Sequence, residues 1–387
     1  DDEAIKAAFL DDPTFTDGTY NLPVDARWST IIQTPAPKLN VALDTALHSI
    51  AASSKQLKGC FVEGTFTTRN LAPNDIKQVV DEVNKISHRV FGEEKDLIGR
   101  VYEYFLKEFA VNATKEEGEF YTPHDVVQLI ATMIEPFDGT LYDPCCGSGG
   151  MFVQSTDLIR EKRGDIRRIN VYGQEKEAAT YRLAKMNLAL RGISHNLGEE
   201  SDSTFTHDLF KGLYFDYIMA NPPFNVDKVN SESAQSAGRL PFGLPSINKN
   251  KEFGNANYLW ISYFYSYLNE HGRAGFVMAS SATDSSGKDR DIRQKLVETG
   301  HVDVMVSVGN NFFYTKSLPC SLWFFDKGKP QELRDKVLFI DARNYYTVVD
   351  RTLNEWSDWQ LKNLNAIVWL YRGEVDKYIK LLDDYRR

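Results

Sequence analysis

Short apolar segments alternate with longer stretches of helical spacing from about residue 140 onward in this sequence. The short segments have the length and composition of buried β-strands. Strands separated by helices pair in parallel, because a parallel connection needs a crossover. We therefore predict an α/β fold with a doubly wound sheet, whose last strands have no clear helix between them. The predicted strands are residues 140–142, 169–173, 215–220, 274–279, 302–308, 320–326 and 337–341.

Helical patterns dominate the sequence before this alternation. They cover residues 36–58, 73–90 and 103–110. A further helical pattern at 125–134 places its apolar residues on one face. We predict a mainly helical N-terminal domain over residues 1–112.

The sheet is predicted to lie in a domain of residues 113–345, followed by a helical tail at 346–387. The tail carries apolar residues at helical spacing, among them Trp359 and Leu364. Such a helix packs either on its own domain or on a helix of another chain. We expect the tail to contact a partner protein.

A glycine-rich turn follows the first predicted strand. Residues 141–152 read LYDPCCGSGGMF, which joins a short strand, an acid, a tight loop and a helix start. Glycine permits close approach of a ligand to the backbone, and a helix start offers unpaired N–H groups. No Lys-Ser or Lys-Thr pair closes the loop, which argues against pyrophosphate and favours adenosylmethionine as the ligand. Alternatively, the glycines serve only tight packing of strand on helix. The candidate residues are Asp143, Pro144, Gly147, Ser148, Gly149 and Gly150.

Two further acidic residues follow predicted strands. Glu175 comes after the strand at 169–173, where a carboxylate can accept hydrogen bonds from both hydroxyls of a ribose. The alternative is that Glu175 only stabilises the start of the next helix. Asp208 follows a possible strand at 196–200 and is a candidate acceptor for the amino group of the cofactor's adenine.

The tetrapeptide Asn221-Pro222-Pro223-Phe224 ends another predicted strand. Two prolines make a rigid loop that has free carbonyls and few N–H donors. The Asn221 amide oxygen and the Pro222 carbonyl can together accept both hydrogens of an NH2 group, while Phe224 stacks on the ring that carries it. The pattern therefore predicts a pocket for the methylation of an exocyclic amine. A proline-rich turn that merely closes the strand is the alternative.

Four motifs in this order resemble those of DNA amino-methyltransferases: Glu119-Phe120-Tyr121-Thr122-Pro123, the Asp143 turn, Gln174-Glu175 and Asn221-Pro222-Pro223-Phe224. More closely, residues 74–356 are similar to the modification subunit of type I restriction-modification systems. The resemblance implies the class I adenosylmethionine-dependent methyltransferase fold, with an antiparallel hairpin among the last strands.

The resemblance also implies roles for individual residues. The segment from Glu119 to His124 would cover the methionine end of S-adenosylmethionine, the Asp143 turn would lie beneath the cofactor, and Glu175 would bind its ribose. The methyl acceptor would be N6 of an adenine flipped out of duplex DNA, with no covalent intermediate.

Other acceptors present a similar planar nitrogen. N4 of cytosine in DNA, a protein glutamine and an RNA guanine N2 all remain alternatives, as does a binding module that keeps the cofactor pocket as a scaffold or sensor. The Phe120-Tyr121-Thr122-Pro123 segment favours the DNA family, and Phe224 favours adenine by family resemblance.

The formal net charge of −9 is unusual for a protein that approaches DNA, whose affinity for proteins rests on Lys and Arg. We therefore expect a separate polypeptide to read the DNA sequence. The resemblance identifies this partner as a specificity subunit, and adds double-stranded DNA, a second copy of the chain and a restriction (motor/nuclease) subunit. Basic positions that either clamp the duplex or are ordinary surface charge are Lys228, Arg239, Lys249, Lys251, Lys288, Arg290 and Arg293.

The four cysteines, at 60, 145, 146 and 320, have no spacing typical of a disulfide framework or a zinc site. We expect no metal, and we expect Cys145 and Cys146 to be buried, unreactive thiols. No stretch approaches the roughly 20 apolar residues of a membrane helix, and the acidic N-terminus is unlike a signal peptide. These features indicate a cytoplasmic protein of a bacterium or archaeon.

Residues 226–251 are polar and rich in Ser, Asn and Gly. Their length exceeds that of an ordinary connection and suits a mobile loop over a substrate. Disordered filler is the alternative.

Overall fold

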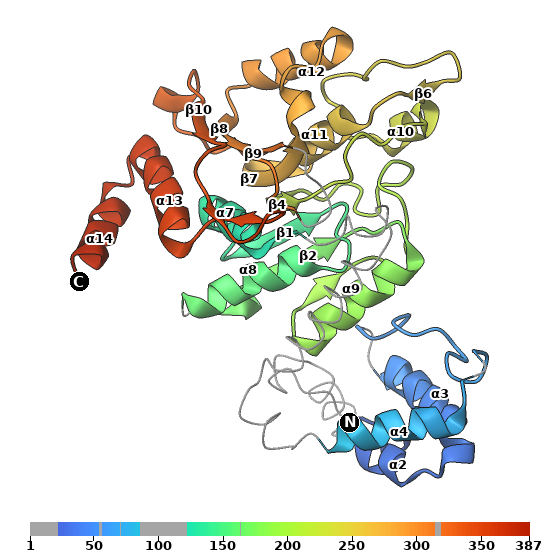
Figure 1. The fold of residues 1–387 in the computed structure, drawn as a ribbon. Helices are drawn as coiled ribbons and strands as arrows, with labels where there is room; N and C mark the ends of the chain where they lie inside the picture. Colours follow the sequence, from blue (N-terminus) through green and yellow to red (C-terminus); the bar gives the residue numbers. More distant parts are fainter. Residues whose placement is uncertain (1–21, 54–55, 70, 86–121, 163, 314–318) are drawn as a thin grey trace, which may run out of the picture.

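A mixed sheet with helices on both faces forms the centre of the molecule (Figure 1). The computed structural model describes residues 22–53, 56–69, 71–85, 122–162, 164–313 and 319–387. In this part of the chain the large sheet has eight strands. They are β1 (Gly139–Asp143), β2 (Ile169–Gly173), β3 (His195–Asn196), β4 (Phe215–Ala220), β7 (Leu268–Ala279), β8 (Val302–Val308), β9 (Cys320–Asp326) and β10 (Leu338–Ala342).

The strand order is β10-β8-β9-β7-β4-β1-β2-β3. Strand β9 is antiparallel to its neighbours β7 and β8, and the other neighbouring pairs are parallel. All seven predicted strands are confirmed, although the one predicted at 274–279 begins earlier, at Leu268. The antiparallel pairing of the consecutive strands β8 and β9 confirms the hairpin that the resemblance implied. Two small sheets pair β5 (Val229–Asn230) with β6 (Glu252–Phe253) and β11 (Thr347–Val348) with β12 (Asn354–Glu355).

Helices connect most of these strands. The α-helices are α2 (Trp28–Gln33), α3 (Ala36–Ser53), α4 (Pro73–Asn84), α7 (His124–Ile134), α8 (Gly150–Glu161), α9 (Ala178–Leu190), α10 (Ser231–Ala237), α11 (Asn257–Ser266), α12 (Gly287–Glu298), α13 (Asp358–Arg372) and α14 (Val375–Arg386). Short 3-10 helices are η1 (Val24–Ala26), η3 (Ile166–Arg168), η4 (Ser280–Thr283) and η5 (Gln331–Leu333). Among the described helices, none combines the length and the apolar composition that a membrane crossing requires.

The two faces of the sheet carry separate apolar clusters, because successive residues of a strand point to opposite faces. In β4, Ile218 and Ala220 belong to one cluster and the intervening Met219 to the other. The Met219 cluster includes residues of α7, α8, α9 and α13, whereas the Ile218 cluster includes residues of α11 and α12. Helices therefore cover both faces, as a doubly wound sheet requires.

The described part of the N-terminal region is helical and has its own small core, which contains Ile31, Leu39 and Val80. The helix predicted at 36–58 ends at Ser53, and the one predicted at 73–90 is described up to Asn84. The helix predicted at 103–110 lies outside the described residues. The boundary at residue 112 stays a prediction.

The segment after α3 packs on the sheet domain. Leu57 and Cys60 contact Ala189 of α9. Lys185 of the same helix donates from Nζ to the Lys58 carbonyl, 2.7 Å away.

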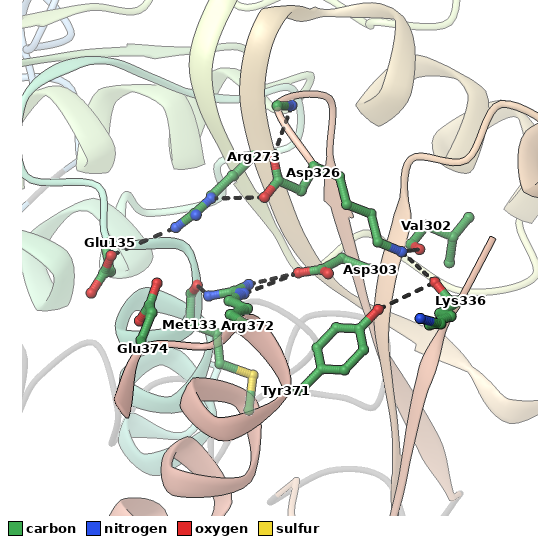
Figure 2. A network of polar contacts seen from close by, with 12 residues as sticks. Met133, Glu135, Arg273, Val302, Asp303, Asp326, Lys336, Tyr371, Arg372 and Glu374 are labelled. Atoms are coloured by element: carbon green, nitrogen blue, oxygen red, sulfur yellow. Dashed lines mark hydrogen bonds and ion pairs between the residues drawn. The ribbon is translucent and has the colours of Figure 1, made fainter. Parts of the chain in front are cut away.

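Helices α13 and α14 make up most of the C-terminal tail, which docks through one buried and one partly exposed ion pair (Figure 2). The Arg372 guanidinium is 2.7 Å from the Asp303 carboxylate and donates to the Met133 carbonyl, also at 2.7 Å. In α14, Lys377 pairs with Glu135 at 2.6 Å. These contacts fasten α13 and α14 to β8 and to the end of α7. That the tail also contacts a partner stays a prediction.

Residues 226–251 are more regular than the predicted loop. They contain β5 and α10, and the Asn230 side chain caps α10 by accepting from the Ser233 N–H at 2.9 Å. Both the N–H and the hydroxyl of Ser231 donate to the Lys251 carbonyl. The segment is therefore a small hairpin-like excursion with internal hydrogen bonds.

Candidate active site

Residues at the carboxyl ends of β1, β2 and β4 line a cavity of about 460 Å³. Strand β1 lies between β2 and β4, so the strand order changes direction there, which is where doubly wound sheets bind ligands. The volume is in the range of small-molecule sites. Nine of the predicted residues line it: Thr122, Asp143, Pro144, Gly147, Ser148, Gly150, Glu175, Asn221 and Pro223.

The glycine-rich turn has the backbone conformation that its sequence predicts. Gly147 and Gly149 have φ of 55° and 79°, in the left-handed region that favours glycine. Gly149 lies outside the lining and precedes the first residue of α8, Gly150, where an added Cβ would meet open space. The Asn187 amide holds the turn by donating to the Ser148 carbonyl at 3.0 Å.

Glu175 connects the turn to the next helix. One carboxylate oxygen accepts from the Gly147 N–H at 3.0 Å, and the other accepts from the Glu177 N–H at 2.8 Å, just before α9. Each oxygen keeps a second lone pair for a ligand hydroxyl. Burial raises the pKa of the Glu175 carboxyl. The predicted ribose contact and the alternative helix-start role are therefore compatible.

Asp143 is 2% exposed and lies at the end of β1. Its Oδ1 accepts from the Cys145 N–H at 2.9 Å. Burial raises the pKa of Asp143 to about 7, and the nearby charge of Glu175 adds to the effect. Two acidic groups with raised pKa thus line one cavity.

The Asn221 amide is oriented by a hydroxyl. Its Nδ2 donates to Thr122 Oγ1 at 3.0 Å. In the part of the chain that the structure describes, no group donates to Asn221 Oδ1, so that oxygen can accept from a ligand. Thr122 was predicted to contact the cofactor, and its bond to Asn221 was not predicted.

The rest of the tetrapeptide is less exposed to the cavity. Pro223 lines it, whereas Pro222 is buried outside the lining. Phe224 is half-buried and packs against both core clusters of the sheet. Stacking of Phe224 on a base stays a prediction.

The motif at 119–124 is only partly visible. Glu119, Phe120 and Tyr121 lie outside the described residues. Pro123 and His124 do not line the first cavity but a second one of about 840 Å³, between α7, α8 and α13. His124 Nδ1 is 3.0 Å from the amide oxygen of Gln154, a residue that lines the first cavity. The structure thus does not bring Pro123 and His124 together with the other predicted residues.

The placement of Asp208 corrects the prediction of an adenine contact. Its side chain is 5% exposed and lies outside the cavity lining, 2.9 Å from Arg239 Nε. The other oxygen accepts from the Tyr267 hydroxyl at 3.0 Å. Arg239 in turn lies over the Tyr267 ring, 4.2 Å from its centroid. Asp208 is therefore part of a buried ion pair that holds the hairpin-like excursion of residues 226–251, which contains Arg239.

Loop residues after β3, rather than Asp208, line the cavity. Ser203, Thr204 and Phe205 line the cavity, and the Thr204 hydroxyl donates to the Pro144 carbonyl at 2.5 Å. The Phe205 ring lies 4.5 Å from the ring of Trp260, which comes from α11. The sequence signal that could have identified this loop as part of the site is Phe205, an aromatic residue shortly after the possible strand at 196–200.

Cys146 of the turn is buried, as predicted, whereas Cys145 is only partly buried, and both cysteines line the cavity. Burial raises the pKa of both Cys145 and Cys146 well above the ordinary value, so the thiols stay protonated and are poor nucleophiles. Within the described ranges, no group of three or more His, Cys, Asp or Glu residues is arranged to hold a metal ion.

The predicted basic positions fall into three groups: one residue that lines the cavity, two that have internal partners, and four others that are exposed, namely Lys249, Lys251, Lys288 and Arg290. Lys228 lines the cavity. Arg239 and Arg293 have internal partners, since Arg293 donates to the Tyr258 hydroxyl at 2.9 Å. Lys251 pairs with Glu232 at 2.5 Å on the surface.

Comparison with known proteins gives a consistent result. Residues 93–383 match the model of the family described as N-6 DNA Methylase. The chain is 33% identical over 376 residues to the type I restriction enzyme MjaIX methylase subunit of Methanocaldococcus jannaschii, with 94% of this chain and 65% of that protein covered. It therefore spans slightly less than two thirds of the length of that relative.

Solved structures share the fold. The type I restriction-modification system methyltransferase subunit from Streptococcus thermophilus has a TM-score of 0.74 at 22% identity, covering 94% of this chain and 80% of that one. A Listeria monocytogenes protein assigned to the class I S-adenosylmethionine-dependent methyltransferases has a TM-score of 0.55 at 13% identity, covering 81% and 91%. The predicted fold class is thus confirmed.

Proposed function

Because the chain belongs to the N-6 DNA methylase family, we propose that it is the catalytic modification subunit of a type I restriction-modification system. In this proposal it transfers a methyl group from S-adenosylmethionine to N6 of an adenine in double-stranded DNA. The observation that carries the proposal is the convergence of Asn221, Glu175 and the Asp143 turn on one cavity.

The cavity residues fit the chemistry of S-adenosylmethionine. Glu175 offers two carboxylate oxygens for the ribose hydroxyls, and the glycine turn offers close backbone approach. The loop residues Ser203 to Phe205, which also line the cavity, supply polar and aromatic surface beside them. When bound, S-adenosylmethionine supplies an electrophilic methyl group.

Asn221 and the Pro222 carbonyl act on the acceptor nitrogen in this mechanism. Both accept from the amino hydrogens, and these bonds strengthen as the nitrogen becomes pyramidal in the transition state. Asn221 is a hydrogen-bond acceptor rather than a base, and Thr122 fixes the direction of its amide. Phe224 stacks on the flipped base once the base enters.

We further propose that sequence recognition comes from a specificity subunit, with a second copy of this chain and a restriction subunit in the larger assembly. The formal net charge of −9 supports the assignment of catalysis and sequence recognition to different subunits, because an acidic chain binds a phosphate backbone poorly by itself. The cytoplasm of a bacterium or archaeon is the compartment we propose.

Transfer of labelled methyl groups from S-adenosylmethionine to duplex DNA tests this function, with the chain alone and with its specificity subunit. We expect N6-methyladenine only when the partner is present. Labelled N4-methylcytosine would support the closest chemical alternative, and labelling of RNA or protein but not DNA would overturn the proposal.

Two variants separate the residue roles. Asn221→Ala should lower kcat by at least about 100-fold with little change in cofactor affinity, whereas Glu175→Ala should first raise the Kd for S-adenosylmethionine. The exposed Glu199→Ala is a matched control that should alter neither quantity. The opposite pattern for Asn221 and Glu175 would contradict the assigned roles.

A further inference from the structure

The residue that follows the tetrapeptide has an unusual backbone conformation. Asn225 has φ of 55°, in the left-handed region, where Asn is one of the few residues tolerated besides glycine. The chain therefore turns sharply directly after Phe224. Such a conformation persists when surrounding contacts hold it.

The contacts that hold Asn225 come from two other asparagines. Asn257 Oδ1 accepts from the Asn225 N–H at 2.9 Å, and Asn257 Nδ2 donates to Asn225 Oδ1, also at 2.9 Å. Asn255 Nδ2 donates to the same Asn225 oxygen at 2.8 Å, and Asn255 Oδ1 accepts from the Asn257 N–H at 2.8 Å. These three residues form a closed set of hydrogen bonds, which we call the asparagine clamp.

The asparagine clamp is attached to a rigid element. Asn257 is 3% exposed and is the first residue of α11. The next residues of this helix, Tyr258, Leu259 and Trp260, are buried against the sheet, and Trp260 also lines the cavity. The Ala256 N–H adds a bond to the Val226 carbonyl at 2.9 Å. The start of α11 thus cannot move without disturbing the core.

We propose that Asn257 is a positioning residue for methyl transfer, acting by fixing the exit of the Asn221–Phe224 turn. The inference rests on the proposed function. Strand β4 fixes the entry of the turn, and the asparagine clamp fixes its exit, so the rigid Pro222-Pro223 pair between them has one orientation. Asn221 and Pro223, which line the cavity, then keep one placement relative to the acceptor base.

Catalysis depends steeply on such placement, because a displacement of about 1 Å can cost about 100-fold in rate. The cofactor residues Asp143, Gly147 and Glu175 do not depend on Asn257, since they are held by hydrogen bonds among themselves and to their neighbours. Loss of Asn257 should therefore affect turnover rather than cofactor binding.

The experiment uses the full chain with its specificity subunit and measures kcat for methyl transfer together with the Kd for S-adenosylmethionine. Asn257→Ala should lower kcat at least about tenfold and change the Kd by less than about twofold. Asn225→Gly keeps the left-handed backbone and the N–H bond to Asn257 but loses the hydrogen bonds of the Asn225 side chain. Its kcat should therefore fall less than that of Asn257→Ala.

The double variant Asn225→Gly/Asn257→Ala tests whether Asn257 acts through Asn225. If it does, kcat of the double variant should equal that of Asn257→Ala within about twofold, whereas two independent effects would multiply. The matched control is Asn269→Ala, which removes an Asn bond to Asp216 near the other end of β4 and should leave kcat unchanged.

Three outcomes would overturn the proposal. The first is a wild-type kcat in Asn257→Ala, and the second is a multiplied fall in kcat in the double variant. The third is a Kd for S-adenosylmethionine that rises in Asn257→Ala in parallel with the fall in kcat. An equal fall in kcat in Asn269→Ala would also overturn the proposal, because any weakening of β4 would then be enough to lower kcat. Wild-type protein that transfers no methyl group would contradict the proposed function itself.

Discussion

The hydroxyl of Thr122 determines which end of the Asn221 amide faces the cavity. Thr122→Val keeps the shape of the side chain but removes the hydrogen-bond acceptor. We expect kcat to fall roughly five- to tenfold, the worth of one hydrogen bond of ~1 kcal/mol, while the Kd for S-adenosylmethionine stays unchanged. Methyl-transfer kinetics and cofactor titration measure the two quantities.

Thr122→Ser is the matched control, because it retains the hydroxyl and should keep near-normal kcat. A Kd that rises in Thr122→Val while kcat at saturation is normal would favour the cofactor contact predicted from the motif and contradict the orienting role.

The raised pKa of Asp143 makes a pH-dependent contribution to stability. The folded-state pKa of about 7 exceeds the ordinary value of 3.8, so the folded protein holds this proton more tightly than the unfolded chain. The associated stability is complete below about pH 4 and is lost as the pH rises through 7. Asp143→Asn keeps an acceptor for the Cys145 N–H and cannot lose a proton.

Relative to wild type, the ligand-free Asp143→Asn variant should therefore gain stability between about pH 5 and pH 8, by up to ~4 kcal/mol. Urea unfolding at several pH values measures this difference. Asp341→Asn is the control: Arg343 lowers the pKa of Asp341 to about 2, so its difference from wild type should stay constant over this range. A flat profile for Asp143→Asn would contradict the raised pKa.

Single residues were predictable where a strand end fixed their position. Asp143, Glu175 and Asn221 each follow a predicted strand, and parallel strands bring their carboxyl ends to one edge. Asp208 also follows a possible strand, at 196–200, but its partner Arg239 comes 31 residues later, and no local sequence pattern predicts such a pair. The bond from Asn257 to Asn225 joins positions 32 apart and was missed for the same reason.

Among the secondary-structure elements, the buried strands were predicted best. Strands β2, β4, β8 and β9 have the predicted bounds, because short, mostly apolar segments of this kind admit few other structures. The elements within 226–251 were missed, since β5 has two residues and α10 is polar on most of its surface. Local hydrogen bonds, rather than apolar periodicity, hold these short elements.

The docking of α13 depends on Arg372, which is buried against Asp303 and the Met133 carbonyl (Figure 2). Arg372→Met should reduce the free energy of unfolding by about 3–5 kcal/mol, because it leaves the buried Asp303 carboxylate without a partner. Urea unfolding measures the loss.

Arg386→Met provides the matched control, because its exposed pair with Asp383 should contribute less than about 1 kcal/mol. Adding Asp303→Leu to Arg372→Met should recover part of the stability by removing the unpaired charge. Equal losses in the Arg372 and Arg386 variants would show that burial of the pair is unimportant.

The molecule as a whole combines one sheet domain with two helical regions attached at different places. The N-terminal segment contacts α9 through Leu57 and Cys60, and the C-terminal tail is fixed to α7 and β8. The sequence predicted both regions as helical from their periodicity. It did not predict where they dock, because the docking contacts are isolated long-range bonds such as that from Lys185 to the Lys58 carbonyl.

The insertion of β9 between β7 and β8 has a consequence for how the protein acquires its structure during synthesis. Strands β1, β2, β4 and β7 can pair in the order in which they leave the ribosome, whereas β8 finds its neighbour only after β9 has emerged. Until then, both β8 and the free side of β7 present unsatisfied strand edges, which are prone to mispairing. The closing of the sheet is thus a late event, and nascent chains that end before residue 320 lack the strand that joins its two halves.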